Sequence, residues 1–240
     1  MKTVALIFAG GMGKRMTSSS CPKQFMVIKG KPVIVHTLEK FAKSPFVDAI
    51  VVVCLTNYIG YLKNIIEEYR VNKVLSIVEG GKTGQESIFN GLSEIRRLVE
   101  GNPIVLIHDG VRPFISNETI SENVKCAKKN GNAITVAQAI ETIAVMEEGQ
   151  SISDVYERSK CVLAKAPQTF YLQDILEVHK QAQKDGITDA VDSSSLMFKY
   201  GTKLFTVKCS GANIKITTPE DFYFARALFD MEEDTQLKKL

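Results

Sequence analysis

The sequence predicts an α/β fold with a mostly parallel sheet that is covered by helices on both faces. Short apolar runs alternate with stretches of helical periodicity through the first half of the chain, and these runs are continuously apolar, as in strands buried on both faces. A chain of 240 residues with 45% hydrophobic content can bury a full core. We therefore expect a single domain over residues 1–240.

Four apolar runs predict the strands of this sheet: Val4–Phe8, Ala49–Cys54, Lys73–Val78 and Ile104–Ile107. Between them, apolar residues recur at helical spacing and predict three helices. The apolar faces of these helices are marked by Val33, Ile34, Thr37, Leu38 and Phe41, then by Ile59, Leu62, Ile65, Ile66 and Tyr69, then by Ile88, Leu92, Ile95 and Leu98. Ligand sites in such sheets lie at the carboxyl ends of the strands.

The alternation of strands and helices stops between residues 137 and 168. Residues 139–147 and 151–164 alternate apolar and polar side chains around Glu148-Gly149-Gln150, which has a turn-like composition. This pattern predicts a β-arm at residues 138–166 that projects from the domain. The apolar side of the arm needs a cover, either from its own domain or from the second subunit of a two-fold dimer.

The last part of the chain predicts two helices and two strands. Helical spacing continues over Leu172–His179 and Ser193–Tyr200, and apolar runs at Leu204–Val207 and Asn213–Thr217 predict strands. Thr218-Pro219-Glu220-Asp221 then has the composition of a helix start, with threonine at the N-cap, proline at the first helical position and acids in the first turn. Asp221 is therefore assigned a structural role.

Composition excludes several classes of function. The formal net charge of +3 is too small for a nucleic-acid surface, and no apolar run approaches the ~20 residues needed to cross a bilayer. With three histidines and neither a G-x-S-x-G nor an H-E-x-x-H motif, a hydrolase triad or a zinc peptidase is not supported. Five widely spaced cysteines and the lack of a secretory leader predict a cytoplasmic protein with reduced thiols.

A glycine-rich turn, Ala9-Gly10-Gly11-Met12-Gly13-Lys14-Arg15-Met16, follows the first strand and leads to Pro22-Lys23-Gln24. Glycine lets backbone N–H groups approach a phosphate closely, and Lys14, Arg15 and Lys23 add three cations, so the turn indicates a triphosphate site. Met16 replaces the third glycine of the dinucleotide fingerprint, and Arg15 replaces the Ser or Thr of a Walker loop. The alternative is a solvated turn with surface lysines.

A second glycine turn follows a strand at Gly80-Gly81-Lys82, with Ser87 shortly after it. Its N–H groups and the serine hydroxyl are suited to a base or a ribose, and the alternative is a tight strand-to-helix turn.

Charged residues also follow the strand that ends at His108. Asp109 and Arg112 at such a position need partners such as a metal, a sugar hydroxyl or a phosphate, or else each other in an ion pair. Lys215, in a β-branched run, needs an anionic partner if it faces inward. His108 is interpreted as a packed strand-end residue rather than a base. Cations thus outnumber general bases, which is typical of phosphoryl or nucleotidyl transfer.

Taken in this order, the motifs resemble those of the cytidylyltransferase family that includes 2-C-methyl-D-erythritol 4-phosphate and ribitol-5-phosphate cytidylyltransferases. The resemblance extends from Ala9 to about Ala227. It rests on the first glycine turn, Pro22-Lys23-Gln24, Gly80-Gly81 with Ser87, the H-D-x-x-R-P motif at His108–Pro113, Pro167-Gln168, and the N-I-K-I-T-x-P-E-D motif at Asn213–Asp221. It implies a Rossmann-like three-layer nucleotidyltransferase fold, CTP and a polyol phosphate as substrates, Mg²⁺ as cofactor, and a CDP-polyol and pyrophosphate as products.

The resemblance also implies a role for each matching residue. The catalytic cations are Arg15, Lys23 and Lys215. CTP is bound by Ala9, Gly10, Gly11, Gly13, Lys14, Gly81, Lys82, Ser87, Asp109 and Gly110, and Asp109 also holds the metal. The acceptor is bound by Arg112, Thr142, Arg158, Asp192 and Lys215. Thr142 and Arg158 lie on the arm and reach the neighbouring subunit's acceptor site, which implies a homodimer.

The sequence departs from the methylerythritol pattern at several positions, of which Ala166 and Ala212 concern the acceptor, and Val111–Phe114 and Gln168–Phe170 resemble the ribitol-phosphate branch. Gly84 replaces an arginine, Ala166 a threonine and Ala212 an aspartate, while the family's Thr-Asp aligns with Val191-Asp192 or, in a rival register, with Thr188-Asp189. When a pocket loses polar groups, the acceptor hydroxyls to which it can hydrogen-bond change. These changes favour ribitol 5-phosphate, for envelope or capsule polymers, over methylerythritol phosphate, for isoprenoid synthesis. Glycerol phosphate and two other classes, a non-catalytic sugar-nucleotide-binding protein and a dehydrogenase, remain as alternatives.

Overall fold

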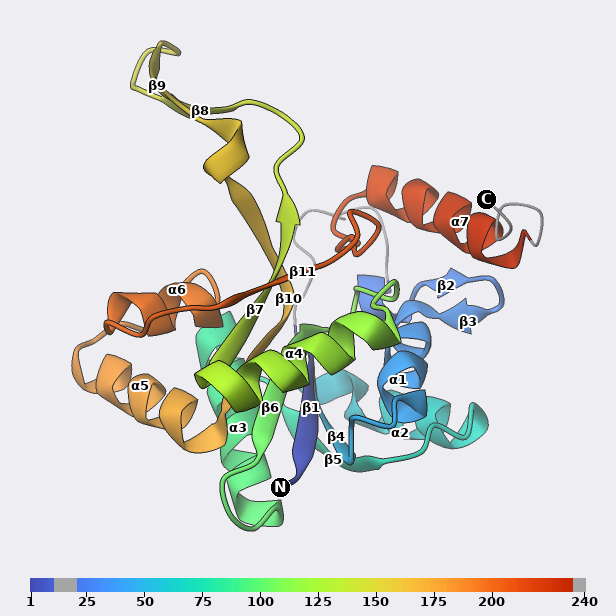
Figure 1. Ribbon diagram of the computed structural model, residues 1–240. Helices are drawn as coiled ribbons and strands as arrows, with labels where there is room; N and C mark the ends of the chain where they lie inside the picture. Colours follow the sequence, from blue (N-terminus) through green and yellow to red (C-terminus); the bar gives the residue numbers. More distant parts are fainter. Residues whose placement is uncertain (11–20, 235–240) are drawn as a thin grey trace.

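The computed structural model describes residues 1–10 and 21–234. Its centre is a seven-stranded sheet in the order β11-β7-β10-β6-β1-β4-β5 (Figure 1). All neighbouring strands are parallel except β10, which runs antiparallel to both β6 and β7. In chain order the strands are β1 (Thr3–Ala9), β4 (Ala49–Cys54), β5 (Val74–Glu79), β6 (Ile104–Asp109), β7 (Asn132–Gln138), β10 (Val162–Tyr171) and β11 (Thr206–Lys208).

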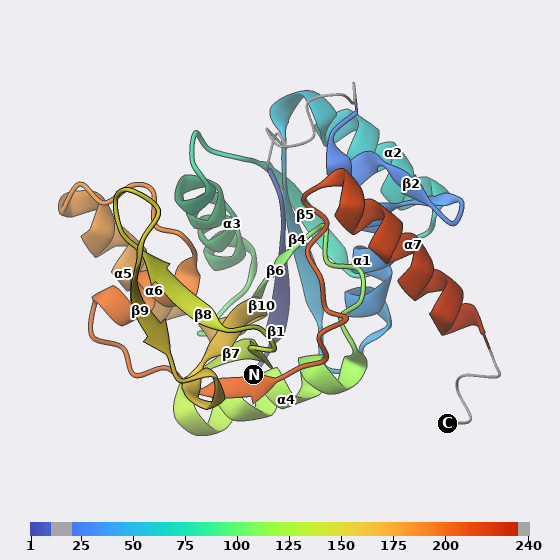
Figure 2. The ribbon, with the colours of Figure 1, turned by 90° about the horizontal axis from the view of Figure 1, so that it is seen from above.

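Helices cover both faces of this sheet and make three layers (Figure 2). One face packs against α1 (Val33–Lys43), α2 (Ile59–Glu68) and α4 (Asn117–Asn130), and the other against α3 (Gly84–Leu98), α5 (Leu172–Lys184) and α6 (Ser193–Lys199). Successive side chains of a strand point to opposite faces, so β1 contributes Ile7 to the first core and Leu6 to the second. The predicted mostly parallel three-layer fold is confirmed.

The predicted β-arm projects from one end of the sheet (Figure 1). Strands β7 and β10 extend together as its base, pairing Gln138 with Val162, and β8 (Ile143–Met146) pairs antiparallel with β9 (Ile152–Tyr156) at its tip. Gly149 and Gln150, in the predicted turn, both have positive φ. The alternating pattern therefore formed a hairpin that stands away from its own domain.

The C-terminal helix α7 (Pro219–Glu233) packs on a small third core beside the hairpin of β2 (Val27–Ile28) and β3 (Lys31–Pro32). Its start is a capping box: the Thr218 side chain accepts a hydrogen bond from the N–H of Asp221, and the Asp221 carboxylate accepts one from the N–H of Thr218. The structural role predicted for Asp221 is confirmed. Three short 3₁₀ helices complete the elements: η1 (Lys23–Phe25), η2 (Thr56–Tyr58) and η3 (Arg158–Lys160).

Some predicted elements differ from the structure. The strand predicted at Asn213–Thr217 is wrong: this segment is a loop whose Ile216 N–H donates to the carbonyl of Val111, in the loop after β6, so it joins no sheet. The strand predicted at Leu204–Val207 is shifted to Thr206–Lys208. Neither α4 nor β7 was predicted; the predicted arm included the first part of β10, and the part that pairs with β6, Gln168–Tyr171, was not predicted as a strand. Within the described residues, none of the helices has the length and apolar character required to cross a membrane.

Candidate active site

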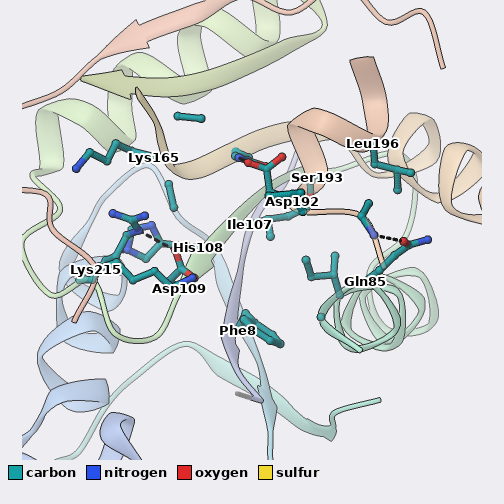
Figure 3. A pocket seen from close by; sticks show the side chains of 18 of the residues that line it. Phe8, Gln85, Ile107, His108, Asp109, Lys165, Asp192, Ser193, Leu196 and Lys215 are labelled. Atoms are coloured by element: carbon teal, nitrogen blue, oxygen red, sulfur yellow. Dashed lines mark hydrogen bonds and ion pairs between the residues drawn. The ribbon is translucent and has the colours of Figure 1, made fainter. Parts of the chain in front are cut away.

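A pocket of about 280 Å³ lies at the carboxyl end of β6 (Figure 3). It is lined by the end of β6 and the loop after it, by the start of α3, by β10, by α6 and the residues before it, and by the loop that carries Lys215, with Phe8 of β1 and His179 of α5 completing the lining. Its charged or polar lining residues are Gln85, His108, Asp109, Arg112, Lys165, Gln168, His179, Asp192, Ser193 and Lys215. The position agrees with the rule that parallel sheets bind ligands where their strands end.

Asp109, the last residue of β6, joins two cations in this pocket. Its Oδ2 atom accepts a hydrogen bond from Nε of Arg112 at 2.7 Å, and its Oδ1 atom lies 2.6 Å from Nζ of Lys215. Arg112 also donates from Nη1 to the carbonyl of Asn213 at 3.0 Å, which fastens the loop of Lys215 to the end of the strand. In the unliganded chain, Asp109 and Arg112 therefore pair with each other, as the ion-pair alternative predicts, and Lys215 faces inward.

The charges of this cluster determine how Asp109 titrates. Burial alone raises the pKa of the Asp109 carboxyl, but the neighbouring charges of Lys215 and Arg112 outweigh burial and hold the pKa well below its usual range. The carboxylate is thus ionised at neutral pH, and the pocket keeps both cations beside one anion.

His108 does not supply a base. It is 1% exposed, its Nε2 atom lies 3.1 Å from the carbonyl oxygen of Arg112, and its ring packs against Phe41. Burial lowers the pKa of His108 to about 4, so the ring is neutral at physiological pH. The interpretation of His108 as a packed strand-end residue agrees with this geometry.

The structure brings the two glycine turns together. A Cβ atom on Gly80 would lie 3.2 Å from Oγ of Ser87 and 3.7 Å from the Cα of Gly10, and one on Gly10 would lie 3.1 Å from the ring of Phe8. Gly81 donates its N–H to Oγ of Ser87 at 2.9 Å. A side chain on Gly80 would crowd the Ser87 hydroxyl, and one on Gly10 would crowd the Phe8 ring, so glycine suits both positions. The Ser87 hydroxyl is buried and organises the second turn.

The first glycine turn begins beside the end of β6. The carbonyl of Ala9 accepts a hydrogen bond from Nε2 of Gln24 at 2.8 Å, and Gly110 donates its N–H to the carbonyl of Phe8 at 2.8 Å. A Cβ on Gly110 would lie 3.3 Å from that of Ala9. Lys23, in η1, is next to Gln24 and so lies close to this turn.

Asp192 reaches the pocket from the N-cap of α6. Its carboxylate accepts hydrogen bonds from the N–H of Ser195 at 2.7 Å and from Nε2 of Gln168 at 2.9 Å. Burial raises the pKa of Asp192, but these hydrogen bonds outweigh burial and lower it below its usual value. Of the two registers left open, the one with Val191-Asp192 puts its aspartate on the pocket wall, and Asp189 does not line it.

Other predicted site residues lie elsewhere. Thr142 and Arg158 are exposed on the arm and do not line the pocket of their own chain; Arg158 donates from Nη1 to the carbonyl of Ile140 at 3.1 Å. Lys82 is exposed, and its N–H donates to the Glu86 carboxylate. The predicted residues Gly11, Gly13, Lys14 and Arg15 lie outside the described residues.

Several pocket residues were not predicted, among them Gln85, His179 and Lys165. Gln85 ties the segment before α6 to α3, donating from Nε2 to the carbonyl of Ile187 and accepting from the N–H of Ala190. His179, on α5, is buried with neither ring nitrogen bonded within the described chain. Lys165 immediately precedes Ala166 and the Pro-Gln motif. Its position next to that motif is the sequence feature that could have identified it as a pocket residue.

The described residues contain no cluster of three or more histidine, cysteine, aspartate or glutamate side chains that could hold a metal on its own. Asp109 is the predicted metal ligand. Mg²⁺ is commonly held by one or two carboxylates together with substrate phosphates and water, so a single ionised carboxylate among phosphate-binding groups is a suitable donor set.

Comparison with known proteins identifies the family. The model of the family described as 2-C-methyl-D-erythritol 4-phosphate cytidylyltransferase matches residues 3–231. The chain belongs to this family. Membership confirms the predicted enzyme class, a CTP-dependent nucleotidyltransferase, and excludes the dehydrogenase and non-catalytic alternatives.

Individual members of the family show a graded similarity. The ribitol-5-phosphate cytidylyltransferase of Vibrio parahaemolyticus is 49% identical over 98% of both chains, and that of Streptococcus agalactiae serotype III is 47% identical over 98% of both. The 2-C-methyl-D-erythritol 4-phosphate cytidylyltransferase of Clostridium acetobutylicum is 39% identical, over 93% of this chain and 96% of its own. The crystal structure of 4-diphosphocytidyl-2C-methyl-D-erythritol synthase from Anaerococcus prevotii superimposes with a TM-score of 0.83 at 27% identity, covering 95% of this chain and 96% of that one.

Proposed function

We propose that the protein transfers CMP from CTP to ribitol 5-phosphate, giving CDP-ribitol and pyrophosphate. The observation that carries the proposal is the difference in identity between the two groups of relatives: 49% and 47% to ribitol-5-phosphate enzymes, against 39% to a methylerythritol phosphate enzyme. Of the two departures expected to concern the acceptor, Ala166 lines the pocket and supports a different acceptor, whereas Ala212 does not line it.

The pocket suits a reaction driven by positioning and charge neutralisation. An oxygen of the acceptor phosphate attacks the α-phosphorus of CTP, the bond from that phosphorus to the bridging β-phosphate oxygen breaks, and pyrophosphate leaves with its electron pair. The acceptor phosphate is already ionised at neutral pH, so no general base is required. Arg112 and Lys215, held in place by Asp109, stabilise the negative charge that gathers between the two substrates.

The nucleotide is assigned to the two glycine turns. Backbone N–H groups from Ala9 to Gly11 and the turn at Gly81-Lys82 bind CTP, while Lys14, Arg15 and Lys23 face its triphosphate. The close packing of Gly10, Gly80 and Ser87 supports this assignment, because it leaves bare backbone beside the end of β6.

Asp109 is proposed to hold Mg²⁺ together with the phosphates of CTP. When bound, the ion supplies further neutralisation of the phosphate charge. The ionised state of the carboxylate, maintained by Lys215 and Arg112, supports this role.

The arm is proposed to join two subunits in a homodimer. Ile140, Met146 and Ile152 on the arm are 77%, 73% and 65% exposed, so the chain leaves an apolar strip that a second subunit would cover. In such a dimer Thr142 and Arg158 act in the acceptor site of the partner. We place the reaction in the cytoplasm, which is supported by five cysteines that form no disulfide among the described residues.

Methylerythritol phosphate is the second candidate acceptor, favoured by the description of the matching family. A pyrophosphate-release assay with CTP and Mg²⁺ separates the candidates when ribitol 5-phosphate, 2-C-methyl-D-erythritol 4-phosphate and glycerol phosphates are supplied in parallel. We expect the highest kcat/KM with ribitol 5-phosphate. A higher kcat/KM with methylerythritol phosphate would reverse the choice of acceptor, and release with none of them would overturn both.

A further inference from the structure

Lys165 is a pocket cation that has no anionic partner among the described residues. It lies on β10, is partly buried and lines the pocket (Figure 3), yet it forms no hydrogen bond or ion pair with the described residues. Burial lowers the pKa of its ammonium group, and the charge of Arg112 lowers it further. A partly desolvated ammonium beside a guanidinium is unfavourable without an anion, so this arrangement calls for a negatively charged ligand.

The other two cations of the pocket are already bound. Arg112 is held by Asp109 and by the carbonyl of Asn213, and Lys215 is paired with the second oxygen of Asp109. The Asp109 carboxylate thus pairs with two cations, and Lys165 adds a third positive charge close to Arg112. The second carboxylate of the pocket, Asp192, is bonded to Gln168 and to the start of α6, so the pocket holds three cations and two carboxylates and keeps a net positive charge.

The strand order determines on which side of the pocket Lys165 lies, and therefore which substrate it is near. In the sheet, β10 and β1 lie on opposite sides of β6, and the two glycine turns follow β1 and β5. Lys165 therefore approaches the pocket from the side opposite to the turns assigned to CTP. A phosphate bound beside it belongs to the second substrate.

We propose that Lys165, together with Arg112, binds the phosphate group of the polyol phosphate acceptor. This inference rests on the proposed function and assigns a further residue to it. A phosphate monoester is largely a dianion at neutral pH, so two cations match its charge. Holding the phosphate from the β10 side orients the attacking oxygen towards the nucleotide and counteracts repulsion between two anionic substrates.

Steady-state kinetics of Lys165→Gln and Lys165→Arg test the proposal, with Lys199→Gln as the matched control. Lys199 is an exposed lysine on α6 that does not line the pocket. We expect Lys165→Gln to raise the KM for ribitol 5-phosphate ~10- to 100-fold, the range for a hydrogen bond to a charged group, and to change the KM for CTP less than about twofold. Lys165→Arg should recover most of the loss, and Lys199→Gln should behave as wild type.

Two results would overturn the proposal while leaving the function intact: an unchanged acceptor KM in Lys165→Gln, or a KM for CTP that rises as much as the acceptor KM. Thermal unfolding of each variant checks that it folds, and Lys165→Met serves as a second neutral variant if Lys165→Gln does not. A wild-type protein that releases no pyrophosphate with ribitol 5-phosphate would instead overturn the proposed function, on which the inference rests.

Discussion

Single residues of the pocket show how this protein holds positive charge ready for phosphate. Asp109 keeps Arg112 and Lys215 in fixed positions before any substrate arrives, with side chains only 11% and 39% exposed. Both cations are already partly desolvated, so a phosphate that enters meets an organised site rather than mobile surface charges. Removing the carboxylate would leave the buried Arg112 and the partly exposed Lys215 without their common partner.

Another single residue, Gly91, leads to a prediction about stability. It lies inside α3, where an added Cβ would be 2.4 Å from Cδ1 of Leu6 and 2.8 Å from Cγ2 of Val53. Because α3 packs directly on β1 and β4 at this point, we expect Gly91→Ala to lower the free energy of unfolding by ~1–3 kcal/mol, which urea denaturation would measure. Gly60→Ala in α2 is the control: nothing lies within 4 Å of its added Cβ, so the variant should be as stable as wild type or slightly more stable. Equal stability of both variants would contradict the tight packing.

Among the elements, the β-arm stands out because its own domain does not cover its tip. Its tip consists of two short strands, β8 and β9, that pair only with each other, and every residue of β9 is exposed. A lone two-stranded hairpin is marginally stable in water, so the arm needs packing from outside its own domain.

Arg158 tests whether that packing comes from a second subunit. In Arg158→Ala we expect the KM for the acceptor to rise about 10-fold or more and the KM for CTP to change much less, because a charged contact to the acceptor phosphate is lost. The neighbouring Lys160→Ala is the matched control, since Lys160 is exposed in the same 3₁₀ helix and pairs with Glu157. An acceptor KM that does not respond to Arg158→Ala would refute arm exchange, as would a monomer in sedimentation experiments that is fully active.

For the molecule as a whole, two buried histidines link stability to pH. Burial lowers the pKa of both His108 and His179 to about 4, from 6.5 in an unfolded chain. Between these values the unfolded chain binds more protons than the folded one, so stability falls as pH decreases from 6.5 towards 4. Each histidine contributes up to about 3 kcal/mol to this loss.

Urea unfolding at several values between pH 7 and pH 4.5 measures the effect. We expect His179→Leu to reduce the difference in unfolding free energy between pH 7 and pH 4.5, because the leucine cannot bind a proton. If the variant and the wild type lost the same unfolding free energy over this interval, protonation of His179 would not contribute to the loss as expected.

The extent to which the fold could be predicted differs between its parts. Strands such as Ala49–Cys54 are continuous apolar runs in a parallel core, so local pattern was sufficient to find them. Asn213–Thr217 has the same β-branched appearance, but its backbone binds Arg112 and the loop residue Val111 instead of a neighbouring strand. The order of strands depends on crossover connections and could not be read from any one segment.

The sequence alone determined the fold class, the family, and four of the five charged residues that line the pocket, because apolar runs and ordered motifs are local features of the chain. Only the tertiary structure decided which charges meet. Asp109, Lys165 and Lys215 come from β6, from β10 and from a late loop, and strand order brings these segments to one pocket. Contacts between residues so far apart depend on how the layers pack, which is why Lys165 became visible only in the folded molecule.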